Sequence, residues 1–476
     1  MRPGFTSFST MNTQTVDAAP KTFDWPLAYE AEALLRRFIE AFLNKNSFAK
    51  TLAQRMQDES GTDFYEWVDH FTLSQEHAGE LQDAGLVREE AEASAGTEIY
   101  YHPKAMMPRA LIQKDASREG VPLNLALRPE SLIDFLAAHD IDARVHGSFG
   151  SRYREAVIAT EGLHRLWAVE HLADRNFVVT PPAAGYVEKV VAVGELWRKR
   201  KRNFADDAQG IRRAFEVQQK AINLVGRDVA CELFFAEERH FWERRNRAGR
   251  IQKRRQDLLG LGWGNHDHHT FRCSRALFAD LIRFLQEFGF EKRERYYAGA
   301  EAGWGAQILE HSVTGITVFA DVDLMPEETE IDFSTKRLPE APRLRTVGLW
   351  CALHGDSLLQ AGMHHLEARF DFSLLRDQLA TEGVNTMKPF SDFAFLKQAF
   401  TEGERWSVAP NRIETLLKKG LITPEQADGF KRDGAVGSHL ENLQRKGGFK
   451  GFNQKSVSVI IEATDPRALQ ATHAEA

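Results

Sequence analysis

The chain has 476 residues, 43% of them hydrophobic and 27% charged, with a formal net charge of −7. This composition is typical of a globular protein of roughly two or three domains, and its acidic balance gives no global reason to expect nucleic acid as a partner. An apolar run of about 18 residues, as a membrane-spanning helix requires, is absent, and three widely spaced cysteines do not fit a disulfide framework. We therefore expect a cytoplasmic protein without a membrane segment.

The first half of the chain is predicted to be mixed and largely helical. Residues 1–24 are polar and lack the apolar stretch of a secretory signal, so we expect a disordered tail there. Apolar positions at helical spacing predict helices over 28–52 and 63–86, and a charged helical pattern runs from 186 to about 259. Between them, HRLWAVEHL and NFVVTPP are typical of short strands. We treat 25–255 as one N-terminal region, for which the sequence suggests no role.

Two clusters of basic residues lie in the charged helical stretch, at 198–202 and at 244–255. One interpretation is a nucleic-acid-binding patch, and the other is the solvated face of a charged helix. Acidic residues and Trp242 lie just before the second cluster, and the whole chain is acidic. We therefore favour the solvated face and do not expect nucleic acid to bind.

From residue 256 to 476 the pattern changes to strand, helix and strand. The segment 275–290 has apolar residues on one helical face, with Ser274 at the expected N-cap and Gly289 at the expected stop. Apolar and polar residues alternate over 315–324, which predicts a half-buried strand. We expect this second region to bind a metal and to carry the catalytic function.

The second region contains the same pattern twice. His268 and Arg272 bound the first copy, which leads into a helix ending at Gly289; His365 and Arg369 bound the second, whose helix also ends at a glycine. Duplicated strand–helix–strand units can form paired, cupped sheets with a metal between them, an arrangement that resembles the vicinal oxygen chelate proteins. The predicted fold class is therefore α+β, a duplicated vicinal oxygen chelate-like sheet module preceded by a largely helical, mixed region.

The repeated histidines are candidate metal ligands. Divalent iron with open coordination positions is typically held by two histidines and one carboxylate. On a strand, His266 and His268 share a face and His269 points away. A His-x-His pair alone is weak evidence, but His268 and His365 occupy matching positions in the two copies. Residues i and i+4 of a strand also share a face, about 13 Å apart. Arg272 and Arg369 can therefore each reach the cavity that the histidine of the same copy faces, and bind the distal carboxylate of a bound acid there.

The carboxylate ligand has to come from another element. Glu441 is the candidate, with Glu310 and Glu462 as alternatives. The pattern alone does not separate a ligand from a surface glutamate at Glu441. Asp321 and Asp323, on the predicted strand, are interpreted as solvated.

Four segments, in order over 265–464, resemble the 2-oxoadipate dioxygenase/decarboxylase family, also called hydroxyglutarate synthase. They are Asp267-His-His-Thr-Phe-Arg272 with the helix and strands after it, His364-His-Leu-Glu-Ala-Arg369-Phe-Asp-Phe, His439-Leu-Glu441-Asn-Leu-Gln-Arg445, and the Gly-Gly-Phe, Asn453 and Glu462 of the closing segment 446–464.

The resemblance implies metal ligands at His268, His365 and Glu441 and a substrate-binding arginine at Arg272. Arg369 would be a second clamp or, alternatively, part of a surface ion pair. The implied activity is that of an Fe(II)-dependent dioxygenase and decarboxylase. It would act on a 2-oxo acid similar to 2-oxoadipate, with dioxygen as co-substrate, to give a shortened hydroxy acid and CO2.

The sequence departs from the family at several positions. Glu367-Ala368 stands where the family has Thr-Pro, and His439 and Asn442 replace aromatic residues beside the glutamate, which leaves the substrate open. Two other functions remain: a metal-dependent isomerase or lyase on the same scaffold, and a non-catalytic protein that binds nucleic acid through its basic helices. Zinc or manganese would also accept these ligands.

Overall fold

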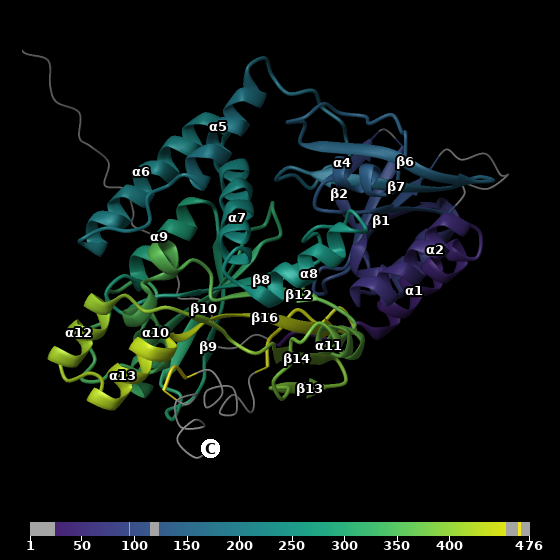
Figure 1. The fold of residues 1–476 in the computed structure, drawn as a ribbon. Helices are drawn as coiled ribbons and strands as arrows, with labels where there is room; N and C mark the ends of the chain where they lie inside the picture. Colours follow the sequence, from purple (N-terminus) through teal and green to yellow (C-terminus); the bar gives the residue numbers. More distant parts are fainter. Residues whose placement is uncertain (1–23, 95, 115–122, 454–464, 468–476) are drawn as a thin grey trace, which may run out of the picture.

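The computed structural model describes residues 24–94, 96–114, 123–453 and 465–467. The expected tail, apart from Asp24, and the alternative ligand Glu462 lie outside these residues. Two β-sheets, each with its own helices, make up the described chain (Figure 1). No helix in these ranges is both long and apolar enough to cross a membrane.

The N-terminal region is built around a seven-stranded sheet in the order β2-β3-β4-β1-β5-β7-β6. Its elements are α1 (Tyr29–Leu43), α2 (Ser47–Arg55), β1 (Val68–Ser74), α3 (Ala78–Asp83), β2 (Val87–Ser94), β3 (Thr97–Tyr101), β4 (Arg109–Gln113), β5 (Asn124–Leu127), α4 (Leu132–Ala138), β6 (Tyr153–Glu161) and β7 (His164–His171). The helical prediction for 28–52 is confirmed by α1 and α2. The prediction of one helix over 63–86 is wrong, because β1 occupies much of its first half and α3 is the only α-helix in this range. Of the two predicted strands, HRLWAVEHL is β7, whereas NFVVTPP forms no strand.

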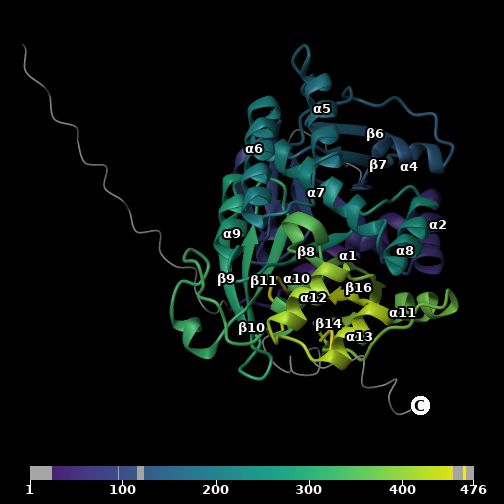
Figure 2. The ribbon, with the colours of Figure 1, turned by 60° about the vertical axis from the view of Figure 1, so that its left-hand side comes forward.

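Four helices connect the sheets: α5 (Tyr186–Arg198), α6 (Asp207–Val225), α7 (Arg227–Glu243) and α8 (Arg247–Asp257). Figure 2 shows α5, α6 and α7 above α9 (Phe278–Glu287), and Gln218 of α6 donates to the Phe284 carbonyl at 2.7 Å. Arg200 and Arg202 of the first basic cluster have largely buried side chains, and both donate to Glu238, at 2.9 and 2.6 Å. These two arginines therefore belong neither to a free basic patch nor to a solvated face.

The second sheet has nine strands and contains two copies of one unit. Its further elements are β8 (His266–Arg272), β9 (Glu291–Tyr297), β10 (Trp304–Glu310), β11 (Thr317–Asp323), α10 (Thr346–His354), β12 (His365–Arg369), α11 (Phe372–Thr381), β13 (Ser391–Phe393), β14 (Leu396–Phe400), β15 (Glu404–Trp406), α12 (Pro410–Lys418), α13 (Pro424–Asp433) and β16 (Ala435–Arg445). The first copy is β8-α9-β9-β10-β11 and orders its strands β8-β11-β10-β9. The second is β12-α11-β13-β14-β16 and orders them β12-β16-β14-β13. In each copy the first strand pairs parallel with the last. The predicted duplicated vicinal oxygen chelate-like fold is confirmed.

The two copies meet at an antiparallel β8–β12 pair whose register makes them symmetric. His365 pairs with Thr270, and Glu367 pairs with His268. A two-fold operation through the centre of this pair exchanges His268 with His365 and Thr270 with Glu367. The repeat found in the sequence is therefore a repeat in space, and the two histidines hold equivalent positions.

The N-terminal sheet uses the same unit. There β1-α3-β2-β3-β4 orders its strands β1-β4-β3-β2 with β1 parallel to β4, and β5-α4-β6-β7 follows with β5 parallel to β7. β1 carries Asp69-His70-Phe71-Thr72 where β8 carries Asp267-His-His-Thr270, and His70 pairs with Ala126 as His268 pairs with Glu367. The N-terminal sheet thus repeats the fold but has an alanine where the second sheet has a carboxylate.

The helix predicted at 275–290 corresponds to α9, and Gly289 adopts φ 103°, which only glycine adopts easily. The expected N-cap is wrong, because the helix begins after Leu277 without a side-chain cap. Ser274 lies farther back and binds Asp356 through its backbone N–H, at 2.5 Å, and its hydroxyl. The strand predicted within 315–324 is β11, but it is buried along its whole length rather than on one face.

Candidate metal centre

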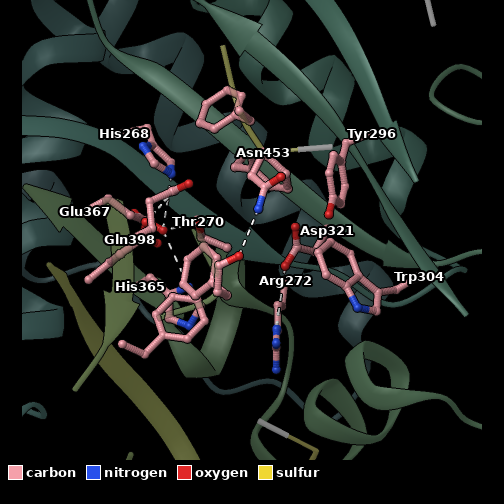
Figure 3. A pocket seen from close by; sticks show the side chains of 15 residues that line it. His268, Thr270, Arg272, Tyr296, Trp304, Asp321, His365, Glu367, Gln398 and Asn453 are labelled. Atoms are coloured by element: carbon pink, nitrogen blue, oxygen red, sulfur yellow. Dashed lines mark hydrogen bonds and ion pairs between the residues drawn. The ribbon is translucent and has the colours of Figure 1, made fainter. Parts of the chain in front are cut away.

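The cupped second sheet encloses a cavity that contains the three predicted ligands. His268 comes from β8, His365 from β12 and Glu441 from β16. In Figure 3, His268, Glu367 and His365 lie on one side of the cavity, and Arg272, Asp321 and Trp304 on the other. The lining residues are His268, Thr270, Arg272, Tyr296, Trp304, Phe319, Asp321, His365, Glu367, Phe390, Gln398, Phe400, Glu441, Phe452 and Asn453.

His268 is oriented by a buried ion pair. Its Nδ1 lies 2.8 Å from Asp267 Oδ1, and Arg445 donates to both oxygens of that carboxylate at 2.9 Å. Because the ionised Asp267 accepts, Nδ1 carries the proton and Nε2 presents a lone pair. A carboxylate behind the histidine is the usual support of a metal-ligating imidazole. Burial also lowers the pKa of His268, which favours the neutral form that binds metals.

Two carboxyl groups share this site. Glu367 Oε1 lies 3.6 Å from His268 Nε2 and 3.5 Å from His365 Nδ1 and accepts a hydrogen bond from the Thr270 hydroxyl. Glu441 Oε1 accepts from Gln398 at 2.7 Å. Burial raises the pKa of Glu441 to about 8, and burial together with the charge of Glu441 raises the pKa of Glu367 well above its usual range. Two buried carboxyls this close disfavour each other's ionisation, and a cation bound beside them would favour the charged forms.

Donor atoms in the cavity and in the protein behind its wall fall into two groups. His268, Glu367 and Glu441 each offer one ligand atom, and these atoms lie within 4.8 Å of one another; so do those of His364, His365 and His439. The predicted set of His268, His365 and Glu441 therefore lines one cavity, but Glu367 stands between its two histidines. Sequence reasoning noted Glu367 only as a departure from Thr-Pro. Its position two residues after His365, on the same strand face, is the feature of the sequence that could have identified it as a further donor.

The imidazole and carboxylate donors that line this cavity fit a divalent cation. His365 Nε2 and Glu367 Oε2 are buried without a hydrogen-bond partner among the described residues, and an unpaired buried polar atom costs about 1–3 kcal/mol. A cation would satisfy both atoms. In the N-terminal sheet, Asn124 and Ala126 occupy the positions of His365 and Glu367, and Trp167 that of Glu441. That sheet thus lacks the donor set at the equivalent place.

Arg272 lies at the other end of the cavity. It is buried, its Nε is 3.7 Å from Asp321 Oδ2, and its Nη1 has no hydrogen-bond partner in the part of the chain described. Burial raises the pKa of Asp321 to about 7, although Arg272 opposes the shift. Asp321 and Asp323 are both buried, so their interpretation as solvated is wrong. Arg272 is positioned to bind an anion that enters the cavity.

Arg369 does not line this cavity. Its Nη1 pairs with Glu66 Oε2 at 3.2 Å, in the space between the two sheets. The ion-pair alternative describes it better than a substrate clamp, although the pair is largely buried rather than on the surface. The alternative ligand Glu310 is also elsewhere and pairs with Lys450 at 2.6 Å.

Comparison with known proteins gives only distant likenesses. No family model and no curated protein matches the sequence. Among solved structures, hydroxyglutarate synthase from Oryza sativa in complex with 2-oxoadipate is 15% identical, over 50% of this chain and 92% of that one, with a TM-score of 0.33. A mutant 4-hydroxymandelate synthase from Streptomyces coelicolor is 14% identical, over 87% and 99%, with a TM-score of 0.25. Methylmalonyl-CoA epimerase from Mycobacterium tuberculosis is 11% identical, over 38% and 88%, with a TM-score of 0.22. Scores this low do not establish a shared fold, so the fold assignment rests on the strand order.

Proposed function

We propose that this chain is an Fe(II)-dependent dioxygenase that decarboxylates a 2-oxo acid. Its metal would be held by His268, His365 and Glu441, and the shortened product would be a hydroxy acid. One observation carries the proposal: buried imidazole and carboxylate donors, and an arginine N–H group, face the same cavity without full hydrogen bonding among the described residues. Three free and buried cysteines are in keeping with a cytoplasmic protein.

Within this proposal Fe(II), when bound, supplies open positions for the substrate and dioxygen and the electrons for oxygen chemistry. The chain's own residues orient the reactants. Asp267 keeps the His268 lone pair directed at the metal position, and Gln398 holds Glu441 through one oxygen and leaves the other for the metal. Glu367 is a second carboxyl beside the metal, close enough to accept or return a proton.

Substrate selection would fall to Arg272. Its unpaired Nη1 suits a carboxylate at the end of the acid farther from the metal. Tyr296, Trp304 and Phe319 line the cavity and would exclude water from the chain of the acid between its two ends. A small dicarboxylic 2-oxo acid matches a cavity with donors at one end and a guanidinium at the other.

Oxygen uptake by protein reconstituted anaerobically with Fe(II) tests the proposal, using a panel of 2-oxo acids that includes 2-oxoadipate. We expect uptake that requires iron and one class of acid and that falls by roughly 100-fold or more in His268→Gln. A matched control is His311→Gln, because His311 is equally buried but binds the Phe288 carbonyl at 2.9 Å, away from the cavity. A bound metal without oxygen uptake for any acid would refute the oxygenase and leave an isomerase or lyase.

A further inference from the structure

The second donor group consists only of histidines, of which His365 lines the cavity and the other two lie buried behind it. His364 precedes β12, His365 begins it, and His439 pairs with His365 across the β12–β16 ladder. The ring centroids lie 3.9 Å apart for His364 and His365, 5.2 Å for His365 and His439, and 5.5 Å for His364 and His439. One ligand atom from each of the three lies within 4.8 Å of the others.

Backbone carbonyls fix the tautomer of two of these rings. His364 Nδ1 donates to the Gly437 carbonyl at 2.9 Å, and His439 Nδ1 donates to the Thr401 carbonyl at 2.8 Å. Since a carbonyl only accepts, each Nδ1 carries the proton and each Nε2 exposes a lone pair. A backbone carbonyl behind the imidazole is the support that metal-ligating histidines generally have.

The Nε2 atoms of these histidines make no hydrogen bond to the described residues. Nε2 of His364, of His365 and of His439 is buried without a hydrogen-bond partner. Trp350 and Phe400 pack against the rings, with centroids 5.0 Å from His364 and 4.3 Å from His365. Three clustered imidazole nitrogens without a hydrogen-bond partner among the described residues are costly to bury unless a cation or a donor satisfies them.

We propose that His364, His365 and His439 form a second metal site, for a late first-row divalent ion such as Zn2+ or Co2+. Three neutral imidazoles and one open position are a ligand set typical of such ions, whereas His268, Glu367 and Glu441 form a harder, oxygen-rich set suited to Fe2+ or Mn2+. With the histidine site empty, His365 completes the catalytic set with His268 and Glu441; with both sites filled, His365 serves the histidine site and Glu367 takes its place beside His268 and Glu441. Arg272 is the positive charge that opposes the second ion, and Asp321, 3.7 Å from it, offsets part of that charge.

Titration of the metal-free protein with Co2+, followed by visible absorption and by metal analysis after gel filtration, tests the proposal. We expect two ions per chain in the wild type and one in His364→Gln and in His439→Gln. The matched control is His354→Gln, which should keep two, because His354 is buried next to Trp350 but uses its Nε2 to bind the Val436 carbonyl at 3.1 Å. Two anomalous scattering peaks in Co2+-soaked crystals of the wild type would establish both sites without relying on any variant.

Different results would refute the two proposed metal sites. Glu441→Gln should lose the ion of the first site only, so retention of both ions in that variant would refute the proposed catalytic centre and leave the histidine site standing. One anomalous peak in the wild type, together with unchanged binding in His364→Gln and His439→Gln, would overturn the second site.

Discussion

Replacing Asp267 by asparagine removes the carboxylate that orients His268 and preserves the size and shape of the side chain. In the wild type the carboxylate accepts from His268 Nδ1 at 2.8 Å and from Arg445 twice at 2.9 Å. An asparagine has one acceptor oxygen and turns two N–H donors toward groups that are themselves donors. His268 is then free to adopt the other tautomer, in which Nε2 carries the proton and is unable to bind a metal.

Two magnitudes follow from this geometry. Loss of a partner behind a metal-binding histidine typically weakens metal affinity by roughly 10- to 100-fold, or about 1.4 to 2.7 kcal/mol. Arg445 is also left buried without a counter-charge, and breaking a buried ion pair in this way costs about 3–5 kcal/mol of folding stability. The variant should therefore be both less stable and weaker in metal binding.

Competition with a metal chelator measures the affinity, and urea unfolding of the metal-free protein measures the stability. A matched control is Glu328→Gln. Arg275 and Glu328 form a comparable buried, bidentate ion pair, with one contact of 2.7 Å, but neither residue lines the cavity. The control should lose stability but keep its metal affinity. Wild-type metal affinity in Asp267→Asn would refute the assignment of His268 as a ligand held by Asp267.

Two predictions concern groups outside the metal centre. Burial lowers the pKa of His354 to about 3 from its usual 6.5, so protonation of this histidine favours the unfolded state as pH falls from 6.5 toward 3. At pH 5 this should lower the free energy of unfolding by about 2 kcal/mol. In urea unfolding, His354→Gln should therefore lose less stability than the wild type between pH 7 and pH 5. Glu238→Gln leaves Arg200 and Arg202 buried without their shared carboxylate, so thermal unfolding should reveal a loss of about 3–5 kcal/mol.

Each of these has a clear contrary result. An unchanged stability difference between pH 7 and pH 5 in His354→Gln would mean that this histidine is protonated in the folded state. For the arginine pair the control is Glu216→Gln, which removes the exposed partner of Arg213 and should change stability by less than about 1 kcal/mol. Equal effects of the two glutamate substitutions would show that the first basic cluster is solvated.

The fold of the second half could be predicted because the evidence is local and repeated. The α9 segment carries an apolar face and a stopping glycine, and the two His-x-x-x-Arg strands mark matching positions of one unit. The N-terminal sheet escaped prediction for a physical reason. β1 is buried on both faces, so it lacks the alternation by which a strand is recognised, and Phe64, Trp67 and Phe71 stand at helical spacing.

The sequence by itself determined that His268 and His365 are equivalent, since each begins a His-x-x-x-Arg strand that leads into a helix ending at a glycine. Tertiary structure alone decided which neighbours join them. Parallel pairing of β12 with β16 brings Glu367 beside Glu441 and His365 beside His439, which no local pattern encodes. The register of β12 against β8 shifts between Glu367 and Ala368. The extra residue at this shift is Asp267 of β8, and Arg369 lies beyond it and pairs with Glu66 outside the cavity. Arg272 lies at the other end of β8, in regular register with β11, and remains in the cavity.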